Sequence, residues 1–206
     1  MDHDAPRAAP AANAPPFAAG GSAAADLARA RRVSQPIVLV GMMGAGKTTV
    51  GRKLAATLER RFVDADEAIV AAAQMSIADM FERYGEAYFR DGERRVIARL
   101  MADASRGAAP VIATGGGAFA DAETRALILD KAIAVWLDAD LATLVERVGR
   151  RSTRPLLQGK DPAAVLAALL EAREVAYAQA PIRVTSGRGP HARTVDAIVA
   201  ELAAWR

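Results

Sequence analysis

Short apolar runs alternate along this chain with longer stretches in which apolar residues recur every three or four positions. Such alternation of strand-like and helix-like patterns is typical of an α/β fold. Five runs predict strands, at residues 36–40, 61–66, 110–114, 132–138 and 182–186. The first, third and fourth are almost continuously apolar, as expected for parallel strands covered on both faces. The pattern therefore predicts a three-layer α/β/α fold whose central layer is a five-stranded parallel sheet.

The stretches between these runs carry helix start signals. Ser76 precedes Asp79 by three residues, which is the spacing of a capping box. Asp161 stands directly before Pro162, and proline suits the first position of a helix. Helices are therefore expected to begin at both places.

Residues 1–34 differ in composition from the rest of the chain. They are rich in Ala, Pro and Gly and contain almost no large apolar side chain, so they cannot bury enough surface to offset the entropy of ordering. We expect a disordered tail here, followed by one domain over residues 35–206. An organelle transit peptide is the alternative, but three aspartates and few serines in this stretch argue against it.

Composition narrows the possible partners. Of 206 residues, 52% are hydrophobic and 25% charged, with a net charge of +3. The basic residues are scattered and aromatic residues make up only 5%, so anionic small molecules are expected as partners rather than nucleic acid. The absence of cysteine excludes disulfides and thiol catalysis. No apolar run approaches the roughly 20 residues of a membrane span, so a cytoplasmic protein is expected, and no long apolar stripe requires more than a monomer.

The stretch GMMGAGKT at residues 41–48 satisfies the pattern G-x-x-x-x-G-K-[ST]. It follows a predicted buried strand and precedes an amphipathic helix. Backbone N–H groups of such a loop turn inward around phosphate oxygens, and the helix N-terminus adds positive potential. Lys47 would reach the β and γ phosphates of ATP, and the Thr48 hydroxyl would bind Mg²⁺. A plain glycine-rich turn is the alternative. The residues expected to contact ATP are Gly44, Ala45, Gly46, Lys47, Thr48 and Thr49.

Two carboxylates end the second predicted strand, in FVDAD. Asp64 and Asp66 are two residues apart, so a continuing strand would direct both side chains to one side at the carboxyl edge of the sheet. One could orient Mg²⁺ through water while the other accepts a hydrogen bond from a substrate hydroxyl. A turn with a capping aspartate is the alternative.

Arg90 and Glu93 lie three residues apart in FERYGEAYFRDGE. On a helix they share a face, so the carboxylate could hold the guanidinium toward an anionic substrate. An ordinary surface ion pair is the alternative. After the third strand, Gly115, Gly116 and Gly117 would let the backbone approach a ligand closely, although a flexible loop has the same composition.

The segment at residues 148–162 is rich in arginine and turn residues and is expected to form a lid over the phosphates. Arg154 would neutralise charge on the transferring group, and a solvated basic loop is the alternative. Arg173 stands four residues before Tyr177 on one helical face. The strand ending in Asp138 imitates a metal-binding strand, but the third strand is the one expected beside the P-loop strand in that role, and it lacks an acid. Asp64 is therefore preferred for Mg²⁺.

In this order, the motifs resemble the shikimate kinase family of P-loop kinases, from about residue 36 to the C-terminus. GMMGAGKTTVGRKLA, FVDAD, FERYGEAYFRDGE, ATGGGA, RPLL and the Arg-x-x-x-Tyr pair all match in sequence and order. The resemblance implies a P-loop kinase fold and phosphorylation of the 3-hydroxyl of shikimate by ATP with Mg²⁺, on the route to chorismate and the aromatic amino acids.

The resemblance also implies residue roles. Arg90 and Arg173 would hold the shikimate carboxylate, Asp66 its ring hydroxyls, and the backbone of the three glycines would contact the same substrate. Asp64 would assist Mg²⁺ through water. Arg147 would stack on adenine, and Arg154 would be the lid arginine. Residues 66–105 would form the substrate-binding helical region. The residues expected to take part in catalysis are Lys47, Asp66 and Arg154.

Three other functions share parts of this pattern. A kinase for another hydroxy acid such as gluconate has the same P-loop and fold, but Asp66, Arg90 and the three glycines favour shikimate. A nucleoside monophosphate kinase is distinguished by testing nucleotides as acceptors. A regulatory ligand sensor would need a DNA-binding module, and residues 1–34 are too few and too poor in large apolar residues to form one.

Overall fold

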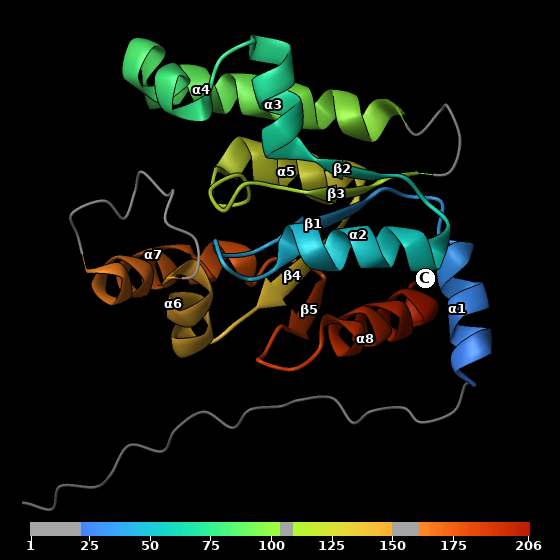
Figure 1. Ribbon diagram of the computed structural model, residues 1–206. Coiled ribbons are helices and arrows are strands. Elements are labelled where there is room, and N and C mark those ends of the chain that lie inside the picture. Colours follow the sequence, from blue (N-terminus) through green and yellow to red (C-terminus); the bar gives the residue numbers. More distant parts are fainter. Residues whose placement is uncertain (1–21, 104–108, 150–160) are drawn as a thin grey trace, which may run out of the picture.

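A computed structural model describes residues 22–103, 109–149 and 161–206. Its five strands form one parallel sheet in the order β2-β3-β1-β4-β5 (Figure 1). Their bounds are β1 Ile37–Val40, β2 Phe62–Asp64, β3 Val111–Ala113, β4 Ile133–Asp138 and β5 Ile182–Thr185. Each begins and ends within two residues of a predicted strand, which confirms the five-stranded parallel sheet.

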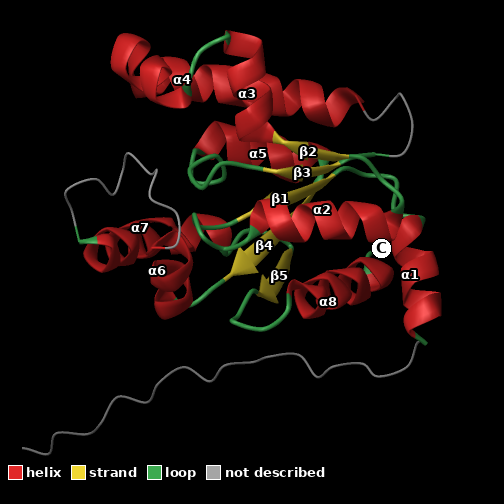
Figure 2. Ribbon diagram, in the orientation of Figure 1, coloured by secondary structure: helices red, strands yellow, loops and turns green. Residues whose placement is uncertain are grey.

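Helices cover both faces of this sheet (Figure 2). Helices α2 and α8 lie together on one face, and α5 lies on the other (Figure 1). Helices α3 and α4 pack against each other beyond the edge formed by β2. The bounds are α1 Ala23–Arg31, α2 Lys47–Leu58, α3 Ala65–Ala73, α4 Ile77–Ala102, α5 Ala122–Lys131, α6 Leu141–Gly149, α7 Pro162–Tyr177 and α8 His191–Ala204.

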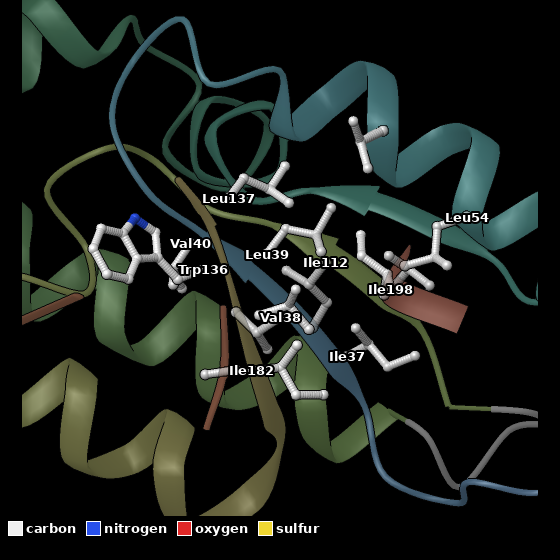
Figure 3. Close-up of a cluster of buried hydrophobic side chains, with 14 of the residues drawn as sticks. Ile37, Val38, Leu39, Val40, Leu54, Ile112, Trp136, Leu137, Ile182 and Ile198 are labelled. Atoms are coloured by element: carbon white, nitrogen blue, oxygen red, sulfur yellow. The ribbon is translucent and has the colours of Figure 1, made fainter. Parts of the chain in front are cut away.

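The core lies between the sheet and its helices (Figure 3). All four residues of β1 are buried, as are the three of β3 and all but the last of β4. Helix α2 contributes Leu54 and α8 contributes Ile198 to the same core. In contrast, β5 alternates buried and exposed residues, because it is an edge strand. Central strands of a parallel sheet bury both faces, so their continuously apolar sequences are explained.

Both predicted helix starts are confirmed. The Ser76 side chain accepts a hydrogen bond from the Asp79 N–H over 3.1 Å at the start of α4. The Asp161 carboxylate caps α7, where Pro162 is the first residue. None of the helices that the structure describes combines the length and the apolar character needed to cross a bilayer.

The expected tail at residues 1–34 is wrong for residues 22–34. Ser22 caps helix α1, which packs against α8 (Figure 1). Ala30 is fully buried in the main core, with Leu27 and Val33 packed against it. The prediction counted large apolar side chains, but alanine has a high helix propensity and its small side chain lets helices approach closely. Residues 1–21 lie outside the described part of the chain.

Candidate active site

The P-loop connects β1 to α2 at the carboxyl edge of the sheet. Gly46 has a φ of +92°, in the left-handed region that glycine adopts without strain, and α2 begins at the next residue. The Lys47 ammonium lies along the loop and donates hydrogen bonds to the carbonyl oxygens of Gly41 over 2.7 Å and Met42 over 2.9 Å. The loop therefore has the strand, turn and helix context that phosphate binding requires.

Thr48 and Asp64 come together beside this loop. The Thr48 hydroxyl donates a hydrogen bond to Asp64 Oδ2 over 2.9 Å. The other carboxylate oxygen of Asp64 accepts a hydrogen bond from the backbone N–H of Asp66 and caps α3. Asp64 therefore caps a helix, as the alternative interpretation predicted, and also lies beside Thr48, where the Mg²⁺ site was expected.

Asp66 does not continue the strand, as the sequence had suggested. Strand β2 ends at Asp64, and Asp66 lies in the first turn of α3. Its carboxylate still faces the cavity beside the P-loop. Burial and the nearby negative charge of Asp64 raise the pKa of Asp66 above its ordinary value, while Lys47 and Arg90 act in the opposite direction. A carboxylate with a raised pKa beside a lysine and an arginine is suited to binding hydroxyl groups and accepting a proton.

Arg90 is held by two carboxylates of its own helix, α4. Its guanidinium contacts Glu93 over 2.6 Å and Glu86 over 3.2 Å. Glu93 is only 1% exposed, so the pair is not the ordinary surface ion pair that was the alternative. Burial raises the pKa of Glu93, and the positive charge of Arg90 opposes this shift.

Helix α4 contains a sharp irregularity that the sequence analysis did not predict. Gly85 has a φ of +79° within the span of the helix, and its backbone there is not helical. A glycine in a helical pattern was the available signal, because only glycine adopts this conformation readily. The kink separates the first turns of α4, which carry Phe81 at the cavity wall, from the turns that carry Arg90. Met75 packs against the small cluster of Ile69, Met80 and Phe89.

The three glycines after β3 make room for the charged side chains. A Cβ atom on Gly115 would lie 2.8 Å from Asp66 Oδ1, and one on Gly117 would lie 2.5 Å from Arg90 Nη2. Any larger residue at either position would displace the side chain that it meets. The glycines were expected to admit a ligand to the backbone, and they also admit Asp66 and Arg90.

Arg173 and Tyr177 of α7 converge on the same turn. Arg173 Nη1 donates to the carbonyl oxygen of Gly116 over 3.0 Å, and the Tyr177 hydroxyl donates to that oxygen too. Arg173 lines the cavity, whereas Tyr177 is buried behind it. Arg173 and Tyr177 are four residues apart on one face of α7, so both reach the same carbonyl oxygen.

Arg147 joins the P-loop to the segment after β5. Its guanidinium donates to the carbonyl oxygens of Gly44 and Ala45 and to Ser186 Oγ, over 3.2 to 3.3 Å, and to the carbonyl of Gly187. The Ala45 side chain is fully buried, and its N–H donates to the Met42 carbonyl over 3.1 Å. The Ala45 side chain is therefore turned away from the cavity, unlike the other residues expected to contact ATP.

One cavity of about 810 Å³ contains the remaining described site residues. It is lined by Gly44, Gly46, Lys47, Thr48, Thr49, Asp64, Asp66, Arg90, Gly115, Gly116, Gly117, Arg147 and Arg173. His191, at the start of α8, also lines it and was not anticipated, since a lone histidine after a proline carries no local signal. Burial, with the positive charges of Arg147 and Lys53, lowers the pKa of His191.

The rejection of Asp138 as a metal ligand and the expectation of a lid remain to be compared with the structure. Asp138 at the end of β4 pairs with Arg183 over 2.8 Å and does not line this cavity. Strand β3 pairs with β1, as assumed when Asp138 was rejected, although β4 pairs with β1 on its other side. Arg154 and residues 150–160 of the expected lid at residues 148–162 lie outside the described residues.

The chain is similar to shikimate kinases over most of its length. Residues 43–203 match the family model described as shikimate kinase. A shikimate kinase of Novosphingobium aromaticivorans is 58% identical over 175 residues, which cover 85% of this chain and 91% of that protein. The structure of a shikimate kinase from Acinetobacter baumannii in complex with shikimate is 35% identical with a TM-score of 0.77, covering 85% and 97% of the two chains. A gluconokinase structure from Sinorhizobium meliloti, covering 84% and 94%, is 19% identical with a TM-score of 0.55 and shares the fold alone.

Proposed function

The chain belongs to the shikimate kinase family, and we propose that its acceptor and nucleotide meet in the cavity between the P-loop, α4 and the three glycines. The protein is an ATP-dependent kinase that phosphorylates shikimate in the biosynthesis of aromatic amino acids. We propose that the phosphoryl group is transferred to the 3-hydroxyl of shikimate in this cavity.

The observation that carries the proposal is the meeting of two kinds of group in one cavity. Lys47 and Thr48 come from the P-loop, while Asp66 and Arg90 come from α3 and α4. The first pair suits a nucleotide, and the second suits an acid that also carries hydroxyl groups. A volume of about 810 Å³ is large enough for two small ligands side by side.

On the acceptor side, Arg90 and Arg173 bind the shikimate carboxylate. Both guanidinium groups line the cavity, and each is already fixed by the protein, Arg90 by Glu93 and Arg173 by the Gly116 carbonyl. Fixed guanidinium groups lose little entropy when they bind a planar carboxylate. Asp66 accepts hydrogen bonds from the ring hydroxyls, and the backbone of residues 115–117 closes this side of the site.

On the nucleotide side, the backbone of residues 44–49 and the start of α2 hold the phosphates of ATP. Lys47 exchanges its contacts with the loop carbonyls for the β and γ phosphates. Arg147 borders the loop from the side of β5 and is the residue assigned to adenine. Arg154 is assigned to the transferring phosphoryl group.

Thr48 and Asp64 would hold Mg²⁺, the Thr48 hydroxyl directly and Asp64 through water. Their oxygen atoms are the hard ligands that this ion prefers. No group of three or more His, Asp or Glu side chains that could hold a metal occurs in the described parts of the chain. P-loop enzymes bind this ion with few protein ligands, together with phosphates and waters. When bound, Mg²⁺ neutralises charge on the phosphates.

In the transfer, the 3-hydroxyl oxygen of shikimate forms a bond to the γ-phosphorus of ATP. The bond from that phosphorus to the bridging oxygen breaks, and ADP leaves. The proton of the hydroxyl passes to the Asp66 carboxylate, whose raised pKa improves it as an acceptor. Most of the acceleration comes from alignment and from the positive charges around the phosphates, because this reaction has a loose transition state.

We also infer that the enzyme acts as a monomer in the cytoplasm, where ATP is available. Every described residue assigned to the site belongs to one chain, so the site needs no second copy. Light scattering coupled to size exclusion would test this inference, and a dimer at micromolar concentration would contradict it.

The direct test of the function is a coupled ADP-release assay with ATP and Mg²⁺. The acceptors are shikimate, quinate, gluconate and nucleoside monophosphates, each at the same concentration. Turnover confined to shikimate is expected. Turnover of gluconate or a nucleotide alone would contradict the assignment, and shikimate binding by calorimetry without ADP release would indicate a sensor instead.

A further inference from the structure

Tyr177 is buried at the last residue of α7, where its hydroxyl lies between two loops of the active site. The residue is 1% exposed. Its hydroxyl donates to the Gly116 carbonyl and lies 3.9 Å from Met42 Sδ in the P-loop. Burial raises the pKa of Tyr177 above its ordinary value, so the hydroxyl keeps its proton and remains a donor at neutral pH.

The ring of Tyr177 is fixed independently of this hydroxyl. It stacks on Trp136 of β4 with a centroid distance of 5.8 Å. Trp136 is itself buried in the sheet. The guanidinium carbon of Arg183 lies over the Trp136 ring, 4.4 Å from its centroid. The stacked ring therefore holds the hydroxyl in a fixed position beside the Gly116 carbonyl.

Gly116 is the point where the acceptor side touches the nucleotide side. A Cβ atom there would lie 3.2 Å from the backbone nitrogen of Met43 and 3.7 Å from the carbonyl oxygen of Gly41. The neighbouring Met42 carbonyl accepts a hydrogen bond from Lys47. Any shift of the glycine turn would therefore change its distance from the loop that carries the catalytic lysine.

We propose that Tyr177 is a positioning residue that holds the turn of residues 115–117 against the P-loop and so aligns the acceptor hydroxyl with the γ-phosphate. It does not line the cavity, so it acts through Gly116 and Arg173 rather than on a substrate. The inference rests on the proposed placement of shikimate beside this turn. It assigns to the tyrosine of the Arg-x-x-x-Tyr pair a function separate from that of Arg173.

Tyr177→Phe is the decisive variant, because it removes the hydroxyl and keeps the ring that stacks on Trp136. The Gly116 carbonyl keeps its hydrogen bond from Arg173, so the fold should survive. The loss of one hydrogen bond that aligns reactants should lower kcat about 10-fold. The dissociation constant of ADP should stay within about twofold of the wild-type value, because the P-loop contacts of Lys47 are retained.

Two controls separate alignment from general packing. Tyr88→Phe removes an exposed hydroxyl from α4 and should leave kcat unchanged. Ile198→Val removes a buried methyl group from α8, away from the glycine turn, so it should lower Tm while kcat stays within about twofold.

The inference is overturned if Tyr177→Phe keeps the wild-type kcat, or if Ile198→Val lowers kcat as strongly as Tyr177→Phe does. It is also overturned if ADP binding weakens in parallel with kcat, since that would mean a general loosening of the P-loop. These results differ from a failure of the proposed function, in which the wild-type protein itself would release no ADP with shikimate.

Discussion

Thr48 donates a hydrogen bond of 2.9 Å to Asp64, although the strand that ends in Asp64 is not a neighbour of the strand that precedes the P-loop. Strand β3 lies between β1 and β2, so Asp64 reaches the P-loop across the end of β3. Strand β3 ends at Ala113, level with Asp64, so no further residue of that strand stands between Asp64 and the P-loop.

This contact predicts that Asp64, and not Asp138, supports Mg²⁺. Asp64→Asn should lower kcat with MgATP about 100-fold, because a charged group beside the metal is lost. Asp138→Asn removes only the partner of the exposed Arg183 and should keep activity within about twofold. Steady-state kinetics at several Mg²⁺ concentrations would check both. A larger loss in Asp138→Asn would return the metal assignment to β4.

The fixed guanidinium of Arg90 predicts a selective loss of acceptor binding. Arg90→Ala should weaken shikimate binding about 10- to 100-fold, since a charged hydrogen-bonding group is removed, while ATP binding changes little. The matched control is Arg94→Ala on the same helix, because Arg94 pairs with Asp91 and Glu123 outside the main cavity. Calorimetry with each substrate separately would measure the two affinities. Equal weakening of both in Arg90→Ala would be inconsistent with the assignment.

The raised pKa of Asp66 predicts that this residue lowers stability at neutral pH. Ionising a carboxyl whose folded pKa exceeds its unfolded pKa costs folding free energy, so stability is greatest below the unfolded pKa and falls as the pH rises through the folded one. Asp66→Asn cannot ionise, so it should have a higher Tm than wild type near neutral pH, with kcat lowered about 100-fold. The difference in Tm should shrink as the pH falls into the ordinary range of aspartate.

Thermal unfolding over a series of pH values would test this, with the exposed Asp196→Asn as the control. A difference in Tm that persists unchanged at acid pH would show that the carboxylate charge is not its cause.

The docked helix α1 predicts different results for two truncations. Residues 1–21 are rich in Ala, Pro and Gly and contain almost no large apolar side chain, so removing them should leave Tm and kcat unchanged. Removing residues 1–34 deletes the buried Ala30, the packing of Leu27 and Val33, and a carbonyl that accepts from Arg60. Burial of that size contributes about 2 to 4 kcal/mol, which corresponds to a fall in Tm of about 5 to 10 °C.

Calorimetric melting of both truncations against the full chain would measure this difference. If the longer deletion melted at the wild-type temperature, α1 would contribute nothing to stability and the original tail boundary at residue 34 would be the better description.

The sequence by itself determined what depends on near neighbours along the chain. Continuous apolar runs located β1, β3 and β4, because a strand buried on both faces needs apolar residues at successive positions. The P-loop, the caps at Ser76 and Asp161, and the pairing of Arg90 with Glu93 follow equally from local spacing.

Only the tertiary structure decided which distant segments meet. The order of the strands brings Asp64 to Thr48, and the approach of α4 to the glycine turn explains why Gly117 has no side chain. The kink at Gly85, the docking of α1 on α8 and the contact of Tyr177 with Gly116 are of the same kind. Each depends on packing between residues far apart in the chain. A local pattern of polar and apolar residues does not determine which surface a helix or loop will contact.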